Sequence, residues 1–176
     1  MFMRINFFSG PCCGKSSTAA YIFSELKARK VNIELISEYI KSWAWESKVP
    51  KSFDQHYIFA KQLHEEDKVL RHGVSVITDS PLWMQIAYME RNNEIFSKEC
   101  ALICEKFDST YPDVVNIFLK RSFDYDENGR YEDLTQAIEM DNNIKKVLKT
   151  YVGGCYKEFC PKNKEEILDY ICSFIH

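Results

Sequence analysis

Residues 9–17, which read SGPCCGKSS, constrain the fold of this chain more than any other segment. A short apolar run at residues 5–8 precedes them, and residues 17–30 have the length and apolar spacing of an amphipathic helix. The order is therefore strand, loop, helix. The segment matches the phosphate-binding pattern G-x-x-x-x-G-K-[ST], known as the P-loop, except that Ser9 replaces the first Gly.

This motif assigns roles to its members. Backbone N–H groups of such a loop and the positive end of the following helix converge on an anion. Lys15 is expected to reach the β- and γ-phosphates of ATP, and the Ser16 hydroxyl to hold Mg²⁺. The alternative is a turn that happens to end in Lys-Ser. The remaining predicted nucleotide-binding residues are Gly10, Pro11, Cys12, Cys13, Gly14 and Ser17.

Length and composition indicate a soluble globular protein. The chain has 176 residues, enough for one well-packed core, so we expect residues 1–176 to form a single domain. Hydrophobic residues make up 45% and charged residues 28%. No apolar run is long enough to span a membrane, and Arg4 interrupts the first apolar stretch, which argues against a secretory signal. We expect a cytoplasmic monomer or homodimer with no membrane partner.

The cysteines and the net charge narrow the function classes further. Seven cysteines lack the spacing of a metal site, so we interpret them as thiols in a reducing cytoplasm. A net charge of −3 argues against a broadly basic nucleic-acid surface, although DNA binding along a local groove stays open. If the protein transfers a phosphoryl group, the net charge therefore favours a small molecule over DNA as the acceptor of that group.

Strand-like and helix-like segments alternate from end to end, which predicts an α/β protein. We expect the three-layer P-loop NTPase fold, with five mostly parallel strands, helices on both faces and an arginine-bearing lid at about residues 120–134. The expected strands are at residues 5–8, 31–36, 74–78, 114–119 and 155–160, and the expected helices at residues 17–30, 39–46, 52–71, 82–91, 94–108, 134–149 and 164–174.

Charged motifs follow four of these strands. In a parallel sheet the ligand-binding loops gather at the carboxyl ends of the strands. The P-loop, Glu38, Asp79 and the loop that carries Arg121 and Arg130 should therefore share one edge. Core packing does not explain this convergence, whereas a catalytic site does.

Two carboxylates on this edge have distinct expected roles. Asp79 ends an apolar strand, as does a carboxylate that holds Mg²⁺ beside a P-loop, although it could also cap the next helix. Glu38 near the γ-phosphate could accept the proton of an attacking hydroxyl, or it could be a solvated acid in a first helical turn. A phosphate group that accepts a phosphoryl group is already ionised and needs no base, whereas an alcohol must lose a proton. Glu38 therefore favours an alcohol as the acceptor. Either Glu38 or Asp79 could be the base.

Other side chains are candidates for substrate contacts and for charge stabilisation. Tyr39 and Trp43 could stack on a planar base, although aromatic residues are usually core. Gln55 could read a nucleobase edge through its amide. Arg121 and Arg130 could stabilise the transferred phosphoryl group from a closing lid, or could lie on a solvated loop.

Taken together, these motifs resemble small P-loop kinases of the nucleoside and nucleotide kinase superfamily, and most closely phage-type ATP-binding proteins. In those sequences G-P-x-x-x-G-K-S is followed by E-L-K, E-Y, D-Q-x-Y-I-F-A-K-Q and I-T-D-S-P-L. The counterparts here lie at residues 10–16, where one residue fewer separates the Pro from the second Gly, and at residues 25–27, 38–39, 54–62 and 77–82, with a lid counterpart in Tyr125 and residues 129–131. Ser9 and the double cysteine depart from the common loop.

The resemblance implies an ATP- and Mg²⁺-dependent kinase but leaves the acceptor open. Relatives are similar to deoxynucleoside kinases, to the ribosylnicotinamide kinase module and to phage kinases that phosphorylate 5-hydroxymethyl-deoxyuridine in DNA. The leading hypothesis is therefore transfer of the γ-phosphoryl group to a nucleoside-like or nucleotide-like hydroxyl. The alternatives are a nucleoside monophosphate kinase, a P-loop ATPase or switch without a small acceptor, and a catalytically silent nucleotide-binding module.

Overall fold

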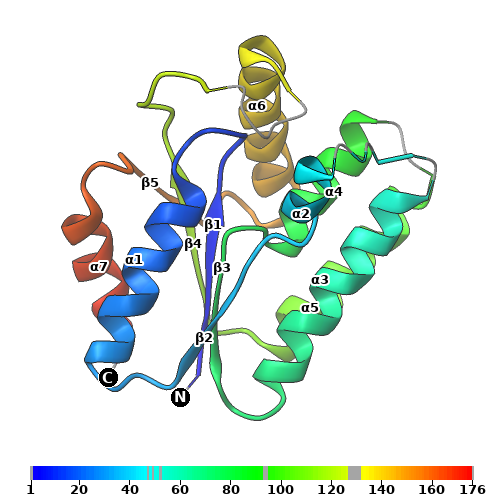
Figure 1. Cartoon of the computed structure of the whole chain (residues 1–176). Coiled ribbons are helices and arrows are strands. Elements are labelled where there is room, and N and C mark those ends of the chain that lie inside the picture. The colour runs from blue at the N-terminus through cyan, green and yellow to red at the C-terminus, as the bar shows by residue number, and fades with distance from the viewer. Residues whose placement is uncertain are drawn as a thin grey trace.

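Five parallel strands form the centre of the molecule in a computed structural model that describes residues 2–46, 48, 50–51, 53–92, 95–126 and 132–175 (Figure 1). Their order across the sheet is β2-β3-β1-β4-β5, and every neighbouring pair runs parallel. The predicted α/β fold is confirmed. The strands are β1 (Arg4–Phe8), β2 (Ile33–Ile36), β3 (Ser75–Thr78), β4 (Val114–Leu119) and β5 (Lys157–Phe159).

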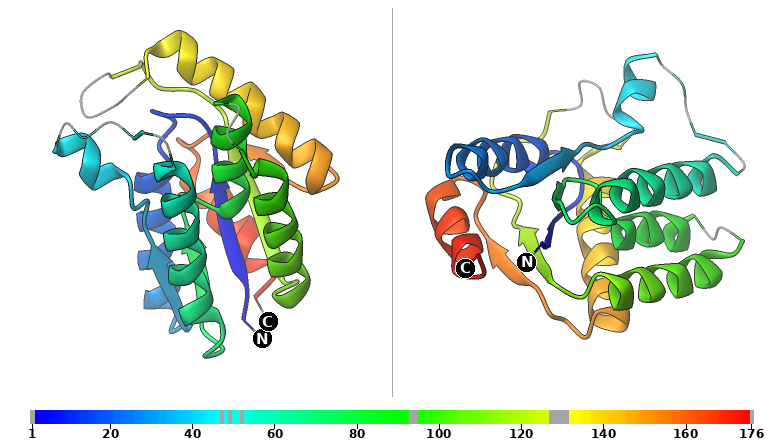
Figure 2. Two further views of the ribbon diagram at one scale, coloured as in Figure 1. Left: turned by 90° about the vertical axis from the view of Figure 1, so that its right-hand side faces the viewer. Right: turned by 90° about the horizontal axis from the view of Figure 1, so that it is seen from below.

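Helices cover both faces of this sheet, as expected for three layers (Figures 1 and 2). One face carries two helices that pack on each other, and the other carries four, with a short helix near the P-loop edge. The first face has α1 (Lys15–Ala28) and α7 (Lys164–Cys172); the second has α3 (Asp54–Leu70), α4 (Leu82–Arg91), α5 (Ser97–Thr110) and α6 (Leu134–Tyr151); the short helix is α2 (Lys41–Trp45).

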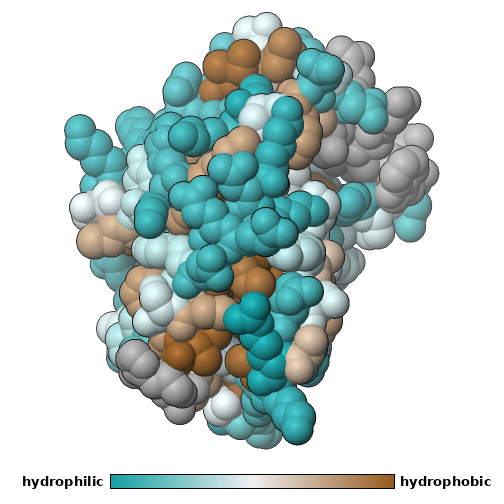
Figure 3. Space-filling view, turned by 90° about the vertical axis from the view of Figure 1, so that its left-hand side faces the viewer, coloured by the Kyte–Doolittle hydropathy of each residue, from teal (hydrophilic) through white to brown (hydrophobic). Residues whose placement is uncertain are grey.

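The central strand β1 explains why the sheet needs both layers. All five of its residues are buried, because β3 and β4 pair with it on either side and helices cover both of its faces. Ile5 and Phe7 point into the core shared with α1 and α7, whereas Phe8 points into the core shared with α3 to α6. Polar side chains cover much of the outer surface on the α1 and α7 side (Figure 3).

Most predicted elements are present, and the differences lie at their ends. α1 begins at Lys15 rather than at residue 17, because the left-handed backbone of Gly14 ends the loop there. α5 begins at Ser97, after Phe96 with a φ of 67°. Among the described residues no helix is long and apolar enough to cross a membrane. All seven cysteines are free thiols.

A carboxyl group lies inside the core on the α3 side of the sheet. Glu66 of α3 is fully buried, and its Oε1 accepts a hydrogen bond of 2.8 Å from Gln62 Nε2. Its Oε2 has no partner among the described residues. Burial raises the pKa of Glu66 to about 7, against the lowering effects of the Arg4 charge and of the Gln62 hydrogen bond.

This burial predicts a pH-dependent stability. Because the folded-state pKa of Glu66 exceeds its ordinary value of 4.5, its contribution to stability is complete below that value and is lost as the pH rises through about 7. Glu66→Gln keeps the shape without the charge. The free energies of unfolding of the variant and the wild type are compared at about pH 4.5 and about pH 8.5. Between these pH values, the difference should shift in favour of the variant by up to about 3 kcal/mol. Urea denaturation at the two pH values measures this, and parallel pH profiles would contradict it.

Candidate active site

The P-loop has the backbone geometry of an anion-binding loop. Cys12 and Gly14 both adopt left-handed conformations, with φ angles of 62° and 78°. Such reversals within a turn direct successive N–H groups into one concavity. The first turn of α1, which starts at Lys15, contains no acidic residue and no side-chain cap, so its N–H groups remain available to an anion.

Ser9 is accommodated because its position does not need a glycine, whereas the next position does. Ser9 is not among the residues with positive φ. A Cβ atom on Gly10 would lie 2.6 Å from the Ala137 carbonyl oxygen and 2.9 Å from Asp141 Oδ1. The departure from the common motif therefore carries no steric penalty, and the close approach of α6 falls on Gly10 instead.

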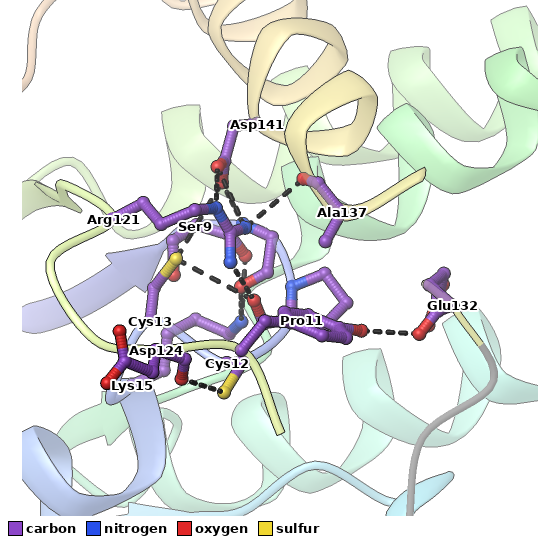
Figure 4. Close-up of polar contacts among 12 residues, drawn as sticks. Ser9, Pro11, Cys12, Cys13, Lys15, Arg121, Asp124, Glu132, Ala137 and Asp141 are labelled. Carbon is purple, nitrogen blue, oxygen red and sulfur yellow. Dashed lines mark hydrogen bonds and ion pairs between the residues drawn. The ribbon is translucent and has the colours of Figure 1, made fainter. Parts of the chain in front are cut away.

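Two side chains brace the loop against α6 (Figure 4). The Gly10 N–H donates to Asp141 Oδ1 at 2.5 Å, and Asp141 Oδ2 accepts from Arg121 Nε at 3.0 Å and from its NH2 at 2.9 Å. Arg121 NH1 donates in turn to the Pro11 carbonyl at 2.8 Å. The guanidinium thus fixes the loop backbone while its charge is paired with Asp141.

Lys15 and Ser16 begin α1 directly after the loop. The Lys15 ammonium donates to the Ser9 carbonyl at 2.7 Å and to the Gly10 carbonyl at 3.0 Å, so it lies across the mouth of the loop. Ser16 is exposed on the first turn of α1. Both residues line one cavity.

That cavity has a volume of about 300 Å³ and joins the P-loop to a second group of side chains. Part of its lining is the P-loop motif, and the rest comes from the segment after β2, from α3, from α4 and from the segment before α6. Beyond residues 11–17, the lining consists of Glu38, Ile40, Lys41, Gln55, Gln85, Tyr88 and Glu132.

Glu38 and Asp79 are neighbours with different surroundings. Asp79 is 3% exposed, and its Oδ1 accepts a hydrogen bond of 2.9 Å from the Glu38 backbone N–H. The Glu38 side chain lines the cavity. Burial raises the pKa of Glu38 above its ordinary value, assisted by the nearby Asp79 and Glu132 carboxylates and opposed by Lys15 and Lys41.

Sequence reasoning missed part of the far end of the cavity. Gln55 lines the cavity. So do three residues that the sequence did not single out: Gln85 and Tyr88, which are three residues apart on α4, and Glu132. Burial raises the pKa of Tyr88, which keeps its hydroxyl protonated. One signal was present: Gln85 is a buried amide within an otherwise apolar stretch of helix that directly follows Asp79.

The predicted aromatic wall lies beside the cavity rather than in its lining. Trp43 is buried and stacks on Tyr57 of α3 at 6.3 Å between ring centroids. Tyr39 packs against both rings edge to face, and its hydroxyl is 3.2 Å from that of Tyr57. Ile40 and Lys41 of the same segment line the cavity instead. A role for Tyr39 and Trp43 in base stacking stays a prediction without support from this packing.

Of the two predicted lid arginines, Arg121 is among the described residues. Arg130 lies outside the described residues. Arg121 is engaged with Asp141, Ala137 and Pro11 and does not line the cavity. Its direct contact with a transferred phosphoryl group stays a prediction, and its observed contacts are those of a residue that positions the loop.

The crowding at Gly10 gives a matched pair of substitutions. Gly10→Ala should lower the free energy of unfolding by about 1–3 kcal/mol and weaken binding of a fluorescent ATP analogue, because α6 must move away from the new methyl group. Ser9→Gly adds no atoms and should cost less than about 1 kcal/mol, from backbone entropy alone. Urea denaturation and ligand titration of both variants measure these effects. Equal losses at the two positions would show that the contact with α6 is unimportant.

Comparison with known proteins agrees with this geometry. No curated protein matches the chain. A family model described as an AAA domain matches residues 4–156, a range that includes the P-loop, Glu38, Asp79 and Asp141. The match covers most of the chain, and with the parallel sheet and the P-loop it indicates a nucleotide-binding domain of the P-loop NTPase type. The chain therefore belongs to the AAA domain family of P-loop proteins.

Proposed function

We propose that this protein transfers the γ-phosphoryl group of ATP, with Mg²⁺, to a hydroxyl group of a nucleoside-like or nucleotide-like acceptor. One observation carries the proposal: Glu38 lines the same cavity as Lys15 and Ser16, together with the buried amides of Gln55 and Gln85. Hydrolysis of ATP requires only a water molecule beside the γ-phosphate and no site for a second substrate. A second compartment beside the phosphates is what a transfer reaction requires.

The chemistry of the donor side chains fits a magnesium nucleotide. Mg²⁺ prefers one or two protein oxygen ligands and takes others from phosphates. In this proposal Ser16, which lines the cavity, would provide a hydroxyl ligand, and Asp79, which is buried and is not part of the cavity lining, would provide a carboxylate. In the described ranges, no group of three or more His, Cys, Asp or Glu forms an independent metal site. When bound, Mg²⁺ neutralises charge on the β- and γ-phosphates. Lys15 adds a further positive charge at the loop.

Glu38 is the better candidate for the general base. A base is most effective when its pKa lies near the working pH, and burial already raises the pKa of Glu38. Asp79 Oδ1 is occupied by the Glu38 N–H, which leaves Oδ2 for the metal or its water. In this proposal Asp79 holds both the metal and the backbone that carries the base. Glu38 accepts the proton of the attacking hydroxyl.

The shape of the cavity favours a small acceptor. The cavity, which includes the P-loop, has a volume of about 300 Å³, and this lies at the lower end for small-molecule sites. A base such as Glu38 argues for an alcohol, so a monophosphate acceptor is the less favoured kinase reaction. A flipped-out 5-hydroxymethyl-deoxyuridine in phage DNA presents the same kind of hydroxyl and is included among the acceptors to be tested.

A second candidate function is ATP hydrolysis that drives a partner. The AAA domain match favours it, because the match itself specifies a P-loop protein and not an acceptor. Steady ATP hydrolysis without any acceptor, stimulated by self-assembly, would support this function over phosphoryl transfer.

Lys15→Ala provides the first test. The variant should lose at least about 100-fold in ATP-dependent transfer, because the positive charge at the phosphates is removed while no packed core residue changes. Transfer from radiolabelled ATP is measured to nucleosides, to monophosphates and to 5-hydroxymethyluracil DNA. Lys27→Ala, which removes an exposed lysine of the same helix, is the matched control and should keep full activity. Full activity in Lys15→Ala would show that the P-loop assignment is wrong.

The pH profile of Glu38→Gln tests the base. Wild-type kcat/KM should rise with pH through a midpoint above 4.5, since Glu38 must lose its proton to act and its pKa is raised. Glu38→Gln should lose about 10²- to 10⁴-fold in kcat together with this acid limb. Glu34→Gln, on the preceding strand and exposed, serves as the control. An unchanged acid limb in Glu38→Gln would assign the proton to another group, with Asp79 the first to examine.

A further inference from the structure

Two amide side chains from different helices meet at the far end of the cavity. Gln55 on α3 is 7% exposed, Gln85 on α4 is 3% exposed, and both line the cavity. Gln55 Nε2 donates to Gln85 Oε1 at 2.8 Å, and Gln85 Nε2 donates to Ser80 Oγ at 2.7 Å. The three side chains form a short relay with one direction.

The relay is anchored at the end of β3. The Ser80 backbone N–H donates to Thr78 Oγ1 at 3.1 Å, and the same oxygen accepts from Gln62 Nε2 at 3.1 Å. All of these groups are buried. These contacts fix the position of Ser80, and the hydrogen bond from Gln85 to Ser80 Oγ in turn fixes the orientation of Gln85.

The relay restricts how the Gln55 amide can turn. Because Gln85 Oε1 faces Gln55, a half-turn of the Gln55 amide would bring two carbonyl oxygens together and leave a buried N–H unpaired. In the described part of the chain, no residue donates to Gln55 Oε1. The Gln55 amide oxygen and the second N–H of its Nε2 thus remain for a ligand in the cavity that Gln55 lines.

We propose that Gln85 is a positioning residue, which through Ser80 holds the Gln55 amide so that it pairs with a planar acceptor molecule. The group recognised is one with an N–H donor beside a hydrogen-bond acceptor, as on the edge of a nucleobase. This inference rests on the proposed phosphoryl transfer, to which it adds the class of acceptor. Because the relay occupies one N–H of the Gln55 amide, the nucleobase edge must pair with the amide oxygen and the other N–H.

The first experiment tests positioning without any acceptor. Hydrogen exchange of the Gln55 side-chain amide is measured by NMR on protein labelled with ¹⁵N-glutamine, the signal being assigned by its loss in Gln55→Leu. Gln85→Leu removes both relay contacts and should speed this exchange at least about ten-fold. Gln85→Glu keeps an oxygen for Gln55 Nε2 and should preserve slow exchange. Ser80→Ala gives a second break of the relay in case Gln85→Leu does not fold.

The second experiment tests recognition. Transfer from radiolabelled ATP is measured with the four 2′-deoxynucleosides and with 2-deoxyribose, which has the hydroxyl but no base. Gln85→Leu should raise KM for the best nucleoside about ten-fold, and by a larger factor than it raises KM for 2-deoxyribose. Gln85→Glu should restore most of the wild-type KM.

The outcomes separate this inference from the proposed function. Unchanged Gln55 exchange in both Gln85→Leu and Ser80→Ala overturns the positioning role, whatever the enzyme phosphorylates. An equal loss for 2-deoxyribose and for nucleosides overturns the recognition of a planar group while phosphoryl transfer stands. If the wild type phosphorylates no nucleoside but hydrolyses ATP in a Lys15-dependent manner, the proposed function and the acceptor class both fail.

Discussion

The hydrogen bond from the Gly10 N–H to the Asp141 carboxylate is the contact on which the site depends. It joins the loop after the central strand to α6, and it forms only because Gly10 has no Cβ in the path of the Ala137 carbonyl. Arg121 pairs with the same carboxylate and holds the Pro11 carbonyl, so the charge of Asp141 is compensated. Contacts with α6 and Arg121 thus hold the backbone of the loop in place, and Lys15 donates hydrogen bonds to the loop carbonyls.

The strand order places the next parts of the site. β3 pairs directly with β1, so the carboxylate that follows β3 emerges beside the loop that follows β1. Asp79 then accepts the N–H of Glu38, which follows the edge strand β2. This contact links the segments that follow two neighbouring strands, β2 and β3, and it holds Glu38 at a partly buried position where its pKa is raised.

Local patterns in the sequence predicted the parts of the site that lie where strands end. Strand, loop and helix signals placed the P-loop, Glu38 and Asp79 on one edge because parallel topology requires it. The partners of Arg121 could not be predicted, since the sequence shows its charge but not the approach of Asp141 from a helix that begins after residue 133. Gln85 and Tyr88 were missed for the same reason: their role follows from how α4 packs between α3 and α6.

The segment from Thr78 to Ser80 couples the two ends of the cavity. Thr78 Oγ1 holds the Ser80 backbone, Ser80 Oγ holds Gln85, and the intervening Asp79 holds the backbone of Glu38. The contacts of Glu38 and of Gln85 therefore originate in one short, buried stretch of backbone rather than in separate loops. In a phosphoryl transfer the barrier depends on the distance and alignment of two bound molecules. In the proposed reaction, one short turn that positions Glu38 as the base, Asp79 as the metal ligand and the amide relay would keep that distance constant from one turnover to the next.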